Sequence, residues 1–279
     1  MMNRRQFLGS AAVAGMAARL AARPAGGPWK MSMYQGSLRK SDPSVFELAK
    51  RVGLDGVELL MGGLKDNLQV RRPEVRLQYK QAAKAQGLVV SSICINILNN
   101  VALKSEPKAA IWLLDTIAAC RDFGCQNILV PFFGKGELNM ENKEEIERVV
   151  DVLKELGPRA QAAEVTLGLE NTLSAENNMA LLEKISAPGV AVYYDVGNSF
   201  NKGRDPAAEI RKLSKRICQI HLKDKGLLGQ GPIDFNAVAA AIRDIDYRGW
   251  LVLETGAPSG DLEKDTAANV QFVHKLFGF

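Results

Sequence analysis

Four polar residues in the second half of the chain each close, or nearly close, an apolar run. Glu170, Asp195 and Glu254 end the runs 165–170, 190–195 and 250–254, and His221 lies near the end of the run 216–224. Residues in these runs alternate between two faces, as in a β-strand. Around His221 the alternation predicts Cys218, Ile220 and Leu222 on the opposite face. Four strands are therefore predicted to carry two glutamates, one aspartate and one histidine to the same side.

Three carboxylates and an imidazole at one place repel one another unless a cation lies between them. A set of oxygen donors with a single nitrogen favours Mn²⁺, Mg²⁺ or Co²⁺ over a structural Zn²⁺. The sequence predicts one divalent ion held by these side chains, with Mn²⁺ as the first choice and Mg²⁺, Co²⁺ and Zn²⁺ as alternatives. Protonated carboxylates that share hydrogen bonds are the competing interpretation. The predicted ligands are Glu170, Asp195, His221 and Glu254.

The elements that position these residues alternate regularly from residue 29 to residue 279. The patterns predict strands at 29–34, 55–60, 88–96, 126–132, 165–170, 190–195, 216–224 and 250–254. Helices are predicted at 43–53, 73–87, 107–124, 141–164, 175–186, 206–213, 235–245 and 262–277, with Gly157-Pro158 as a candidate break in the fourth.

Eight strand–helix units predict parallel strands joined by helical crossovers, and a single closed (β/α)₈ TIM barrel over residues 29–279. An open doubly wound sheet is the alternative. That sheet would be expected to carry a glycine-rich turn after its first strand, and Gln35-Gly36-Ser37-Leu38 is not a dinucleotide fingerprint.

In such a barrel the carboxyl ends of the strands form the mouth of the active site. Strands five and eight are three steps apart around the ring, so Glu170 and Glu254 are predicted to face each other. One carboxylate could remove a proton next to a carbonyl and the other could return it, with the metal stabilising the enediolate. This arrangement suits isomerisation, epimerisation or α,β-elimination of a hydroxy-carbonyl compound.

Over nearly all of residues 29–279 the sequence resembles the xylose isomerase-like barrels of the sugar phosphate isomerase/epimerase family, which is related to the endonuclease IV fold group. The segments that carry the resemblance are Gly53–Leu59, Leu167–Asn171, Tyr194–Asn198, Ile220–Asp224, Gly229–Phe235 and Gly249–Glu254. The resemblance implies a barrel in which Glu170, Asp195, His221 and Glu254 bind the metal. It also implies that Glu170 and Glu254 are the acid/base pair, as in the ketose epimerases of the group.

The sequence departs from the family pattern at two places. Asn198 stands where the family commonly has a histidine, three residues after the strand-six aspartate. The chain has only two histidines, His221 and His274, whereas the endonuclease branch binds three zinc ions through several. DNA repair is therefore excluded as the expected function.

Four further residues are predicted to contact substrate: Glu58, Asn96, Asn198 and Lys223. Two of them have an equally simple structural interpretation. Glu58 could instead pair with a buried base, and Lys223 could be a solvated loop residue.

The function expected from these observations is a divalent-metal-dependent isomerase or epimerase of a sugar or polyol. A lyase, dehydratase or hydratase of a keto-sugar or inosose at the same metal site is one alternative. A non-catalytic exported sugar-binding protein is another. Homo-oligomerisation is left open by the sequence.

The first 25 residues are typical of an export signal. Arg4 and Arg5 precede a weakly apolar stretch, 11–22, which is followed by Arg23-Pro24. The paired arginines resemble the twin-arginine type and predict a periplasmic location. The apolar stretch is too short to span a bilayer comfortably, so no stable membrane span is expected in the mature chain.

The arginines of this segment also account for most of the basic character of the chain. Residues 1–25 hold four arginines and no acid, so removing them reduces the formal net charge from +5 to +1. A nearly neutral body gives no electrostatic reason to expect nucleic acid as a partner.

Overall fold

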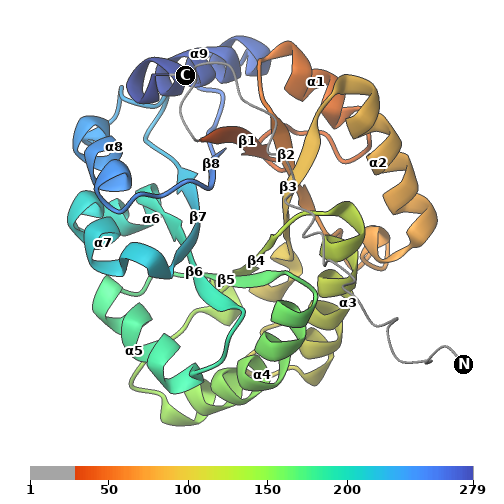
Figure 1. Ribbon diagram of the computed structural model, residues 1–279, viewed down its shortest axis with the longest axis vertical. Coiled ribbons are helices and arrows are strands. Elements are labelled where there is room, and N and C mark those ends of the chain that lie inside the picture. Colours follow the sequence, from red (N-terminus) through yellow and green to blue (C-terminus); the bar gives the residue numbers. More distant parts are fainter. Residues whose placement is uncertain (1–28, 279) are drawn as a thin grey trace, which may run out of the picture.

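The computed structural model describes residues 29–278 and shows a closed ring of parallel strands (Figure 1). Neighbouring strands in the chain pair in order from β1 to β8, and β8 pairs back with β1, which confirms the predicted barrel. The strands are β1 (Lys30–Tyr34), β2 (Gly56–Leu60), β3 (Val89–Cys94), β4 (Asn127–Pro131), β5 (Thr166–Glu170), β6 (Val190–Asp195), β7 (Ile217–Leu222) and β8 (Trp250–Leu253).

Helices form an outer ring around the barrel (Figure 1). The short helix α6, which directly follows β6, was not predicted. The helices are α1 (Val45–Arg51), α2 (Pro73–Gln86), α3 (Pro107–Phe123), α4 (Lys143–Ala162), α5 (Ala175–Ile185), α6 (Val196–Asn201), α7 (Pro206–Leu213), α8 (Phe235–Asp244) and α9 (Leu262–Phe277).

Helix α4 continues through Gly157-Pro158, so the candidate break is not a break. Packing holds the helix together at this point, because Leu153, Leu156 and Ala160 are buried against the core. Gly157 also lets the chain before β6 approach closely, since a Cβ at this position would lie 2.6 Å from the carbonyl oxygen of Pro188. Tertiary contacts thus override the local preference of proline to end a helix.

The core has two parts. The larger part lies between the outer faces of the strands and the helices, and it includes Leu169, Ile220 and Leu253 as the alternation predicted. A smaller cluster lies inside the barrel and contains Cys94, Leu129, Tyr193 and Val252. The interior of the ring is therefore packed with side chains, as in other barrels of eight strands.

The pairing of β6 with β7 contains a β-bulge that sequence alternation missed. Val192 pairs with Ile217 but Tyr193 pairs with Gln219, which leaves Cys218 as an extra residue. Cys218 consequently packs against the interior cluster and not with Ile220 on the outer face. Gly168 makes room for it, because a Cβ on Gly168 would lie 2.8 Å from the Cys218 sulfur.

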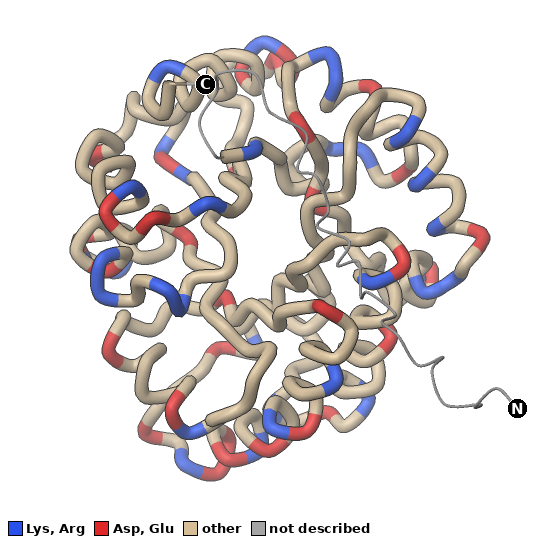
Figure 2. The backbone as a smooth tube through the Cα atoms, viewed as in Figure 1, with Lys and Arg blue, Asp and Glu red and all other residues tan. Residues whose placement is uncertain are grey.

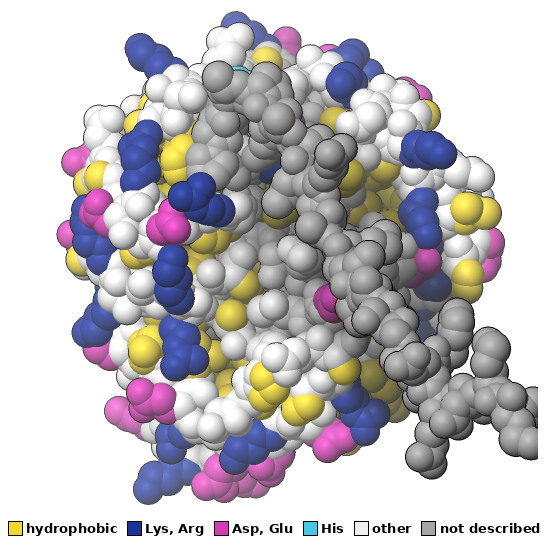
Figure 3. Space-filling model, viewed as in Figure 1, with side chains coloured by type: hydrophobic (Ala, Val, Ile, Leu, Met, Phe, Trp, Pro, Cys, Tyr) yellow, Lys and Arg dark blue, Asp and Glu magenta, His cyan; other side chains and the backbone are white. Residues whose placement is uncertain are grey.

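Charged residues of both signs are interspersed along the outer helices, whereas the strands carry few of them (Figure 2). The space-filling view shows the same mixture around the rim of the visible face (Figure 3). Within residues 29–278, no helix has the length and apolar character needed to cross a membrane. The predicted signal segment, residues 1–25, lies outside the described residues.

Candidate metal centre

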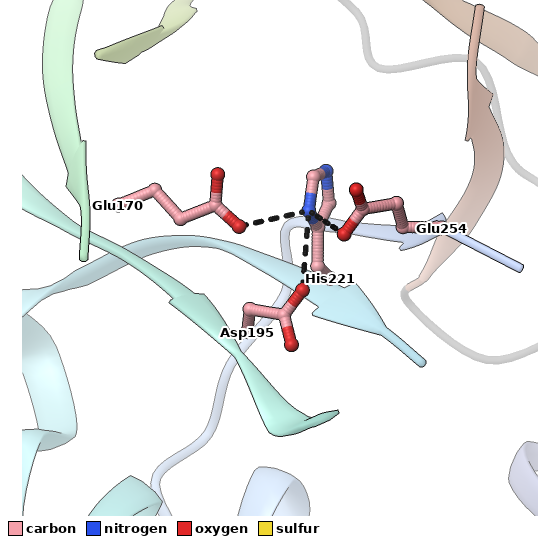
Figure 4. Close-up of side chains that lie close together, drawn as sticks. All are labelled: Glu170, Asp195, His221 and Glu254. Atoms are coloured by element: carbon pink, nitrogen blue, oxygen red, sulfur yellow. Dashed lines mark ion pairs between the residues drawn. The ribbon is translucent and has the colours of Figure 1, made fainter. Parts of the chain in front are cut away.

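The predicted ligands converge at the carboxyl ends of four consecutive strands. Glu170 and Asp195 are the last residues of β5 and β6, His221 lies one residue before the end of β7, and Glu254 directly follows β8. Asp195 and His221 are directly paired across β6 and β7. Figure 4 shows the three carboxylates pointing toward one nitrogen of the His221 ring, with Glu170 and Glu254 on opposite sides of it.

The distances among the donor atoms are those of a shared ion. From His221 Nδ1 the nearest carboxylate oxygens lie at 3.3 Å for Glu170, 3.6 Å for Asp195 and 3.5 Å for Glu254. One ligand atom from each of the four residues lies within 4.8 Å of the others. Ligand atoms bonded to one ion at about 2.0–2.4 Å must lie within roughly 4–5 Å of each other, so the cluster has the required size.

Two buried atoms of the cluster have no hydrogen-bond partner within the protein. They are Asp195 Oδ2 and His221 Nδ1, and both belong to residues that are at least 95% buried. Leaving a buried polar atom unpaired costs about 1–3 kcal/mol. A cation bound between these atoms would satisfy both of them, which is the observation that favours an ion over protonated carboxylates.

The carboxyl groups of the cluster differ in how readily they ionise. Burial raises the pKa of Glu170 to about 7, although the charge of His221 opposes the shift. Burial likewise raises the pKa of Asp195. For Glu254 burial is outweighed by the charges of His221 and Lys223, so its pKa is lowered. Two of three carboxyls therefore resist ionisation where no metal compensates their charge.

Neighbouring groups hold the carboxylates in place. Asp195 caps helix α6, because its Oδ1 accepts a hydrogen bond of 2.6 Å from the backbone N–H of Asn198, which leaves Oδ2 for the cluster. The Asn198 amide nitrogen donates to Glu170 Oε1 at 3.3 Å. Lys223 Nζ donates to Glu254 Oε2 at 2.9 Å. Each ligand carboxylate therefore has a fixed orientation toward the centre.

A pocket of about 250 Å³ opens above the cluster. Three residues predicted to contact substrate, Asn96, Asn198 and Lys223, line it together with Glu170, His221 and Glu254. Asp195 is the one candidate ligand that does not line the pocket.

Six other residues of the described part of the chain line the pocket, and two of them with polar side chains, Tyr34 and Asn99, were missed by sequence reasoning. Tyr34 is the last residue of β1. The same strand-end position that indicated the candidate ligands could therefore have indicated Tyr34. Phe133, two residues after the end of β4, also lines the pocket. Asn99 lies in a short 3₁₀ helix after β3, where no periodicity indicates its direction.

Glu58 lies beneath the pocket and does not line it. It is fully buried, and its Oε1 is 2.9 Å from Nε2 of His221. Of its two predicted roles, substrate contact and pairing with a buried base, the structure places a base beside it.

Residues 46–276 match the model of a family described as xylose isomerase-like TIM barrel.

Among curated proteins, the chain is 26% identical over 223 residues to 2-epi-5-epi-valiolone 7-phosphate 2-epimerase of an Actinoplanes species. That match covers 77% of this chain and 82% of the relative.

Solved structures with the same fold include two epimerases. A structure of L-ribulose 3-epimerase has a TM-score of 0.74 at 22% identity, covering 89% of this chain and 94% of that one. The structure of 3-keto-D-glucoside 4-epimerase YcjR from Escherichia coli also gives 0.74, at 16% identity, covering 88% of this chain and 99% of that one.

Proposed function

Because the chain belongs to the xylose isomerase-like TIM-barrel family, we propose that it is a divalent-metal-dependent sugar epimerase or isomerase that moves a proton next to a carbonyl. One observation carries the proposal. Glu170 and Glu254 both line the pocket and lie on opposite sides of His221 (Figure 4). A sugar carbon held between them would have a carboxylate on each face.

Residues of the pocket are assigned either to metal binding or to proton transfer, and two of them to both. Glu170, Asp195, His221 and Glu254 would hold the ion, and a bound divalent ion supplies Lewis acidity that polarises the carbonyl next to the reacting carbon. One of the two pocket carboxylates takes a proton from that carbon, and the other returns a proton. When the proton returns on the opposite face, the product is the epimer.

Other pocket residues position the sugar. The side-chain amides of Asn96, Asn99 and Asn198 line the pocket and offer both donors and acceptors to hydroxyl groups. Lys223 lines the pocket, and its Nζ, which donates to Glu254 at 2.9 Å, can also donate to a substrate oxygen. Tyr34 and Phe133 provide aromatic walls.

The charges of the pocket favour an unphosphorylated sugar. Among the described residues that line it, Lys223 is the only lysine or arginine, and it is already paired with Glu254 and 3.9 Å from Asp195. Phosphate groups are usually bound by arginine, lysine or a helix N-terminus. A phosphate placed here would instead meet the carboxylates of the cluster.

A panel of free ketoses, 3-keto-sugars and inososes, with matched sugar phosphates, tests the proposal. We expect the Mn²⁺-loaded protein to convert at least one free sugar in D₂O and to incorporate deuterium at the reacting carbon. The value of kcat/KM should be at least about tenfold lower for the matching phosphate, a difference of about 1.4 kcal/mol. The measurement is NMR of the product together with initial rates.

The same panel separates the alternatives. Loss of water from an inosose or keto-sugar without epimer formation would identify a dehydratase. Binding of a sugar without deuterium incorporation in any product would indicate a binding protein and contradict the proposed activity. Equal rates with the phosphate would contradict only the assignment of a neutral substrate.

We also propose that the protein is exported to the periplasm through its paired arginines, Arg4 and Arg5. Replacing both with lysine is expected to keep the protein in the cytoplasm at full length, because the twin-arginine signal is read as an address and not as a charge. Cell fractionation and the mass of the mature protein measure this. The control is the double lysine variant of Arg19 and Arg23, which should still be exported; equal export of both variants would contradict the proposal.

A further inference from the structure

A series of polar side chains, buried except for the half-buried Asn127 at its far end, runs through the barrel interior directly below the metal centre. It starts at Glu58, which accepts hydrogen bonds at its Oε2 from Ser92 Oγ at 2.6 Å and from the Tyr193 hydroxyl at 2.5 Å. It continues through Gln219, whose amide nitrogen donates to both of those hydroxyl oxygens at 2.8 Å. It ends at Asn127, the first residue of β4, which donates to Gln219 Oε1 at 2.7 Å.

The direction of each hydrogen bond from Gln219 to Glu58 can be assigned. Because Gln219 donates to Ser92 and Tyr193, each hydroxyl has its own hydrogen free to donate onward, and both donate to Glu58 Oε2. The carboxylate is thereby held with its other oxygen, Oε1, 2.9 Å from His221 Nε2. An oxygen of a carboxylate accepts, so the hydrogen of this bond belongs to Nε2.

The far side of the imidazole has the opposite character. Nδ1 of His221 has no hydrogen-bond partner and lies 3.3–3.6 Å from the three carboxylates of the cluster. In the neutral ring that metal binding requires, the hydrogen on Nε2 leaves the lone pair on Nδ1, the nitrogen that the three carboxylates face (Figure 4). The two ring nitrogens therefore have different environments, one set by Glu58 and the other by the candidate ligands.

We propose that Glu58 is a positioning residue that holds His221 in the tautomer and orientation needed to bind the metal through Nδ1, and that Ser92, Tyr193, Gln219 and Asn127 hold Glu58 in turn. This inference rests on the metal centre of the proposed function. It assigns Glu58 no contact with substrate, because Glu58 is fully buried and does not line the pocket. Carboxylate partners of this kind fix the ring of metal-binding histidines and raise its basicity.

Replacing Glu58 with glutamine tests the assignment. In that variant an NH₂ group replaces one carboxylate oxygen. If the NH₂ group faces His221 Nε2, it favours the wrong tautomer of the ring. If it faces Ser92 and Tyr193, their hydroxyls lose the oxygen that accepts their hydrogen bonds. We expect the dissociation constant for Mn²⁺, measured by titration calorimetry without substrate, to rise about 10–100-fold. Tyr193→Phe, which removes one donor to Glu58 but keeps the contact with His221, should give a smaller rise.

Glu209→Gln is the matched control. Glu209 is another buried carboxylate that accepts three hydrogen bonds, from Ala175 N at 2.8 Å, Tyr194 OH at 3.2 Å and Ser199 Oγ at 2.5 Å. It has no contact with His221 among those of the described residues. Its substitution should lower thermal stability but leave the Mn²⁺ affinity of the folded protein unchanged, whereas a purely structural role for Glu58 would make the two variants alike.

A second measurement needs no variant at Glu58. His221 and His274 are the only histidines in the chain, so His274→Gln leaves one ring for nitrogen-15 NMR. In the ¹¹³Cd²⁺-loaded protein we expect metal coupling at Nδ1 and a proton on Nε2.

The outcomes are distinct. Coupling at Nε2, absence of its proton, or wild-type Mn²⁺ affinity in Glu58→Gln would overturn the role of Glu58 while leaving the proposed function intact. Failure of the wild-type protein to bind Mn²⁺ would overturn the metal centre and this inference together.

Discussion

Glutamine at position 170 or at position 254 is expected to lower kcat by about 10³–10⁴-fold, because each carboxylate is assigned one proton transfer and general acid–base catalysis contributes up to about 10⁴-fold. Both residues line the pocket in which the sugar would bind. Glutamine keeps the size of each side chain and one oxygen for the ion. The measurement is the initial rate with saturating Mn²⁺.

Hydrogen exchange makes this prediction specific to two opposed bases. The single variant that keeps the proton-abstracting carboxylate should still exchange the substrate hydrogen with D₂O while forming little product. The other variant should do neither with the same epimer, and the two should exchange roles when the reaction starts from the opposite epimer. Identical behaviour of Glu170→Gln and Glu254→Gln with both epimers would contradict the two-base assignment.

Glu263→Gln is the control for these substitutions. Glu263 lies on α9 and forms an exposed ion pair with Arg51 at 2.6 Å, away from the pocket residues. Exposed pairs of this kind contribute about 1 kcal/mol or less to stability. Its substitution should leave kcat and KM unchanged.

Removal of the metal is expected to have the other large effect. Dialysis against a chelator should lower activity by at least about 10³-fold, since Lewis-acid stabilisation of the developing charge supplies several kcal/mol. Adding Mn²⁺ should restore it. At a free Mn²⁺ concentration of about 100 times the dissociation constant, binding should stabilise the fold by about 2.7 kcal/mol and raise Tm by roughly 5–10 °C.

Asp195→Asn separates specific binding from a general salt effect. Asparagine can still accept the hydrogen bond from the Asn198 backbone, so the cap of α6 is kept, but the charge next to His221 is lost. This variant should show no rise in Tm with Mn²⁺. An equal rise in the variant, or full activity in protein holding less than about a tenth of an ion per chain, would contradict the metal centre.

Alternation and turn residues in the sequence predicted most of the fold. A strand exposes alternate residues on its two faces, so the inward direction of Glu170, Asp195 and His221 follows from counting along each run. The barrel followed from the repetition of eight strand–helix units. Counting failed at Cys218, because the β-bulge adds one residue and reverses the faces locally.

Helix prediction failed where contacts distant in the sequence decide the outcome. Gly157-Pro158 is a local signal to end a helix, yet α4 continues because its buried face packs against the core. Helix α6 was not predicted because it has only six residues and follows β6 without a loop. Its N-cap, Asp195, is also the last residue of the strand, so no separate helix start is visible in the sequence.

The sequence by itself therefore determined which residues reach the mouth of the barrel, because side-chain direction along a strand is a local property. Only the tertiary structure decided what those residues meet there. The contacts of Glu58 with His221, of Lys223 with Glu254, and of Asn99 with the pocket join elements far apart in the chain. Their existence depends on barrel closure and strand register, which set distances that no local pattern encodes.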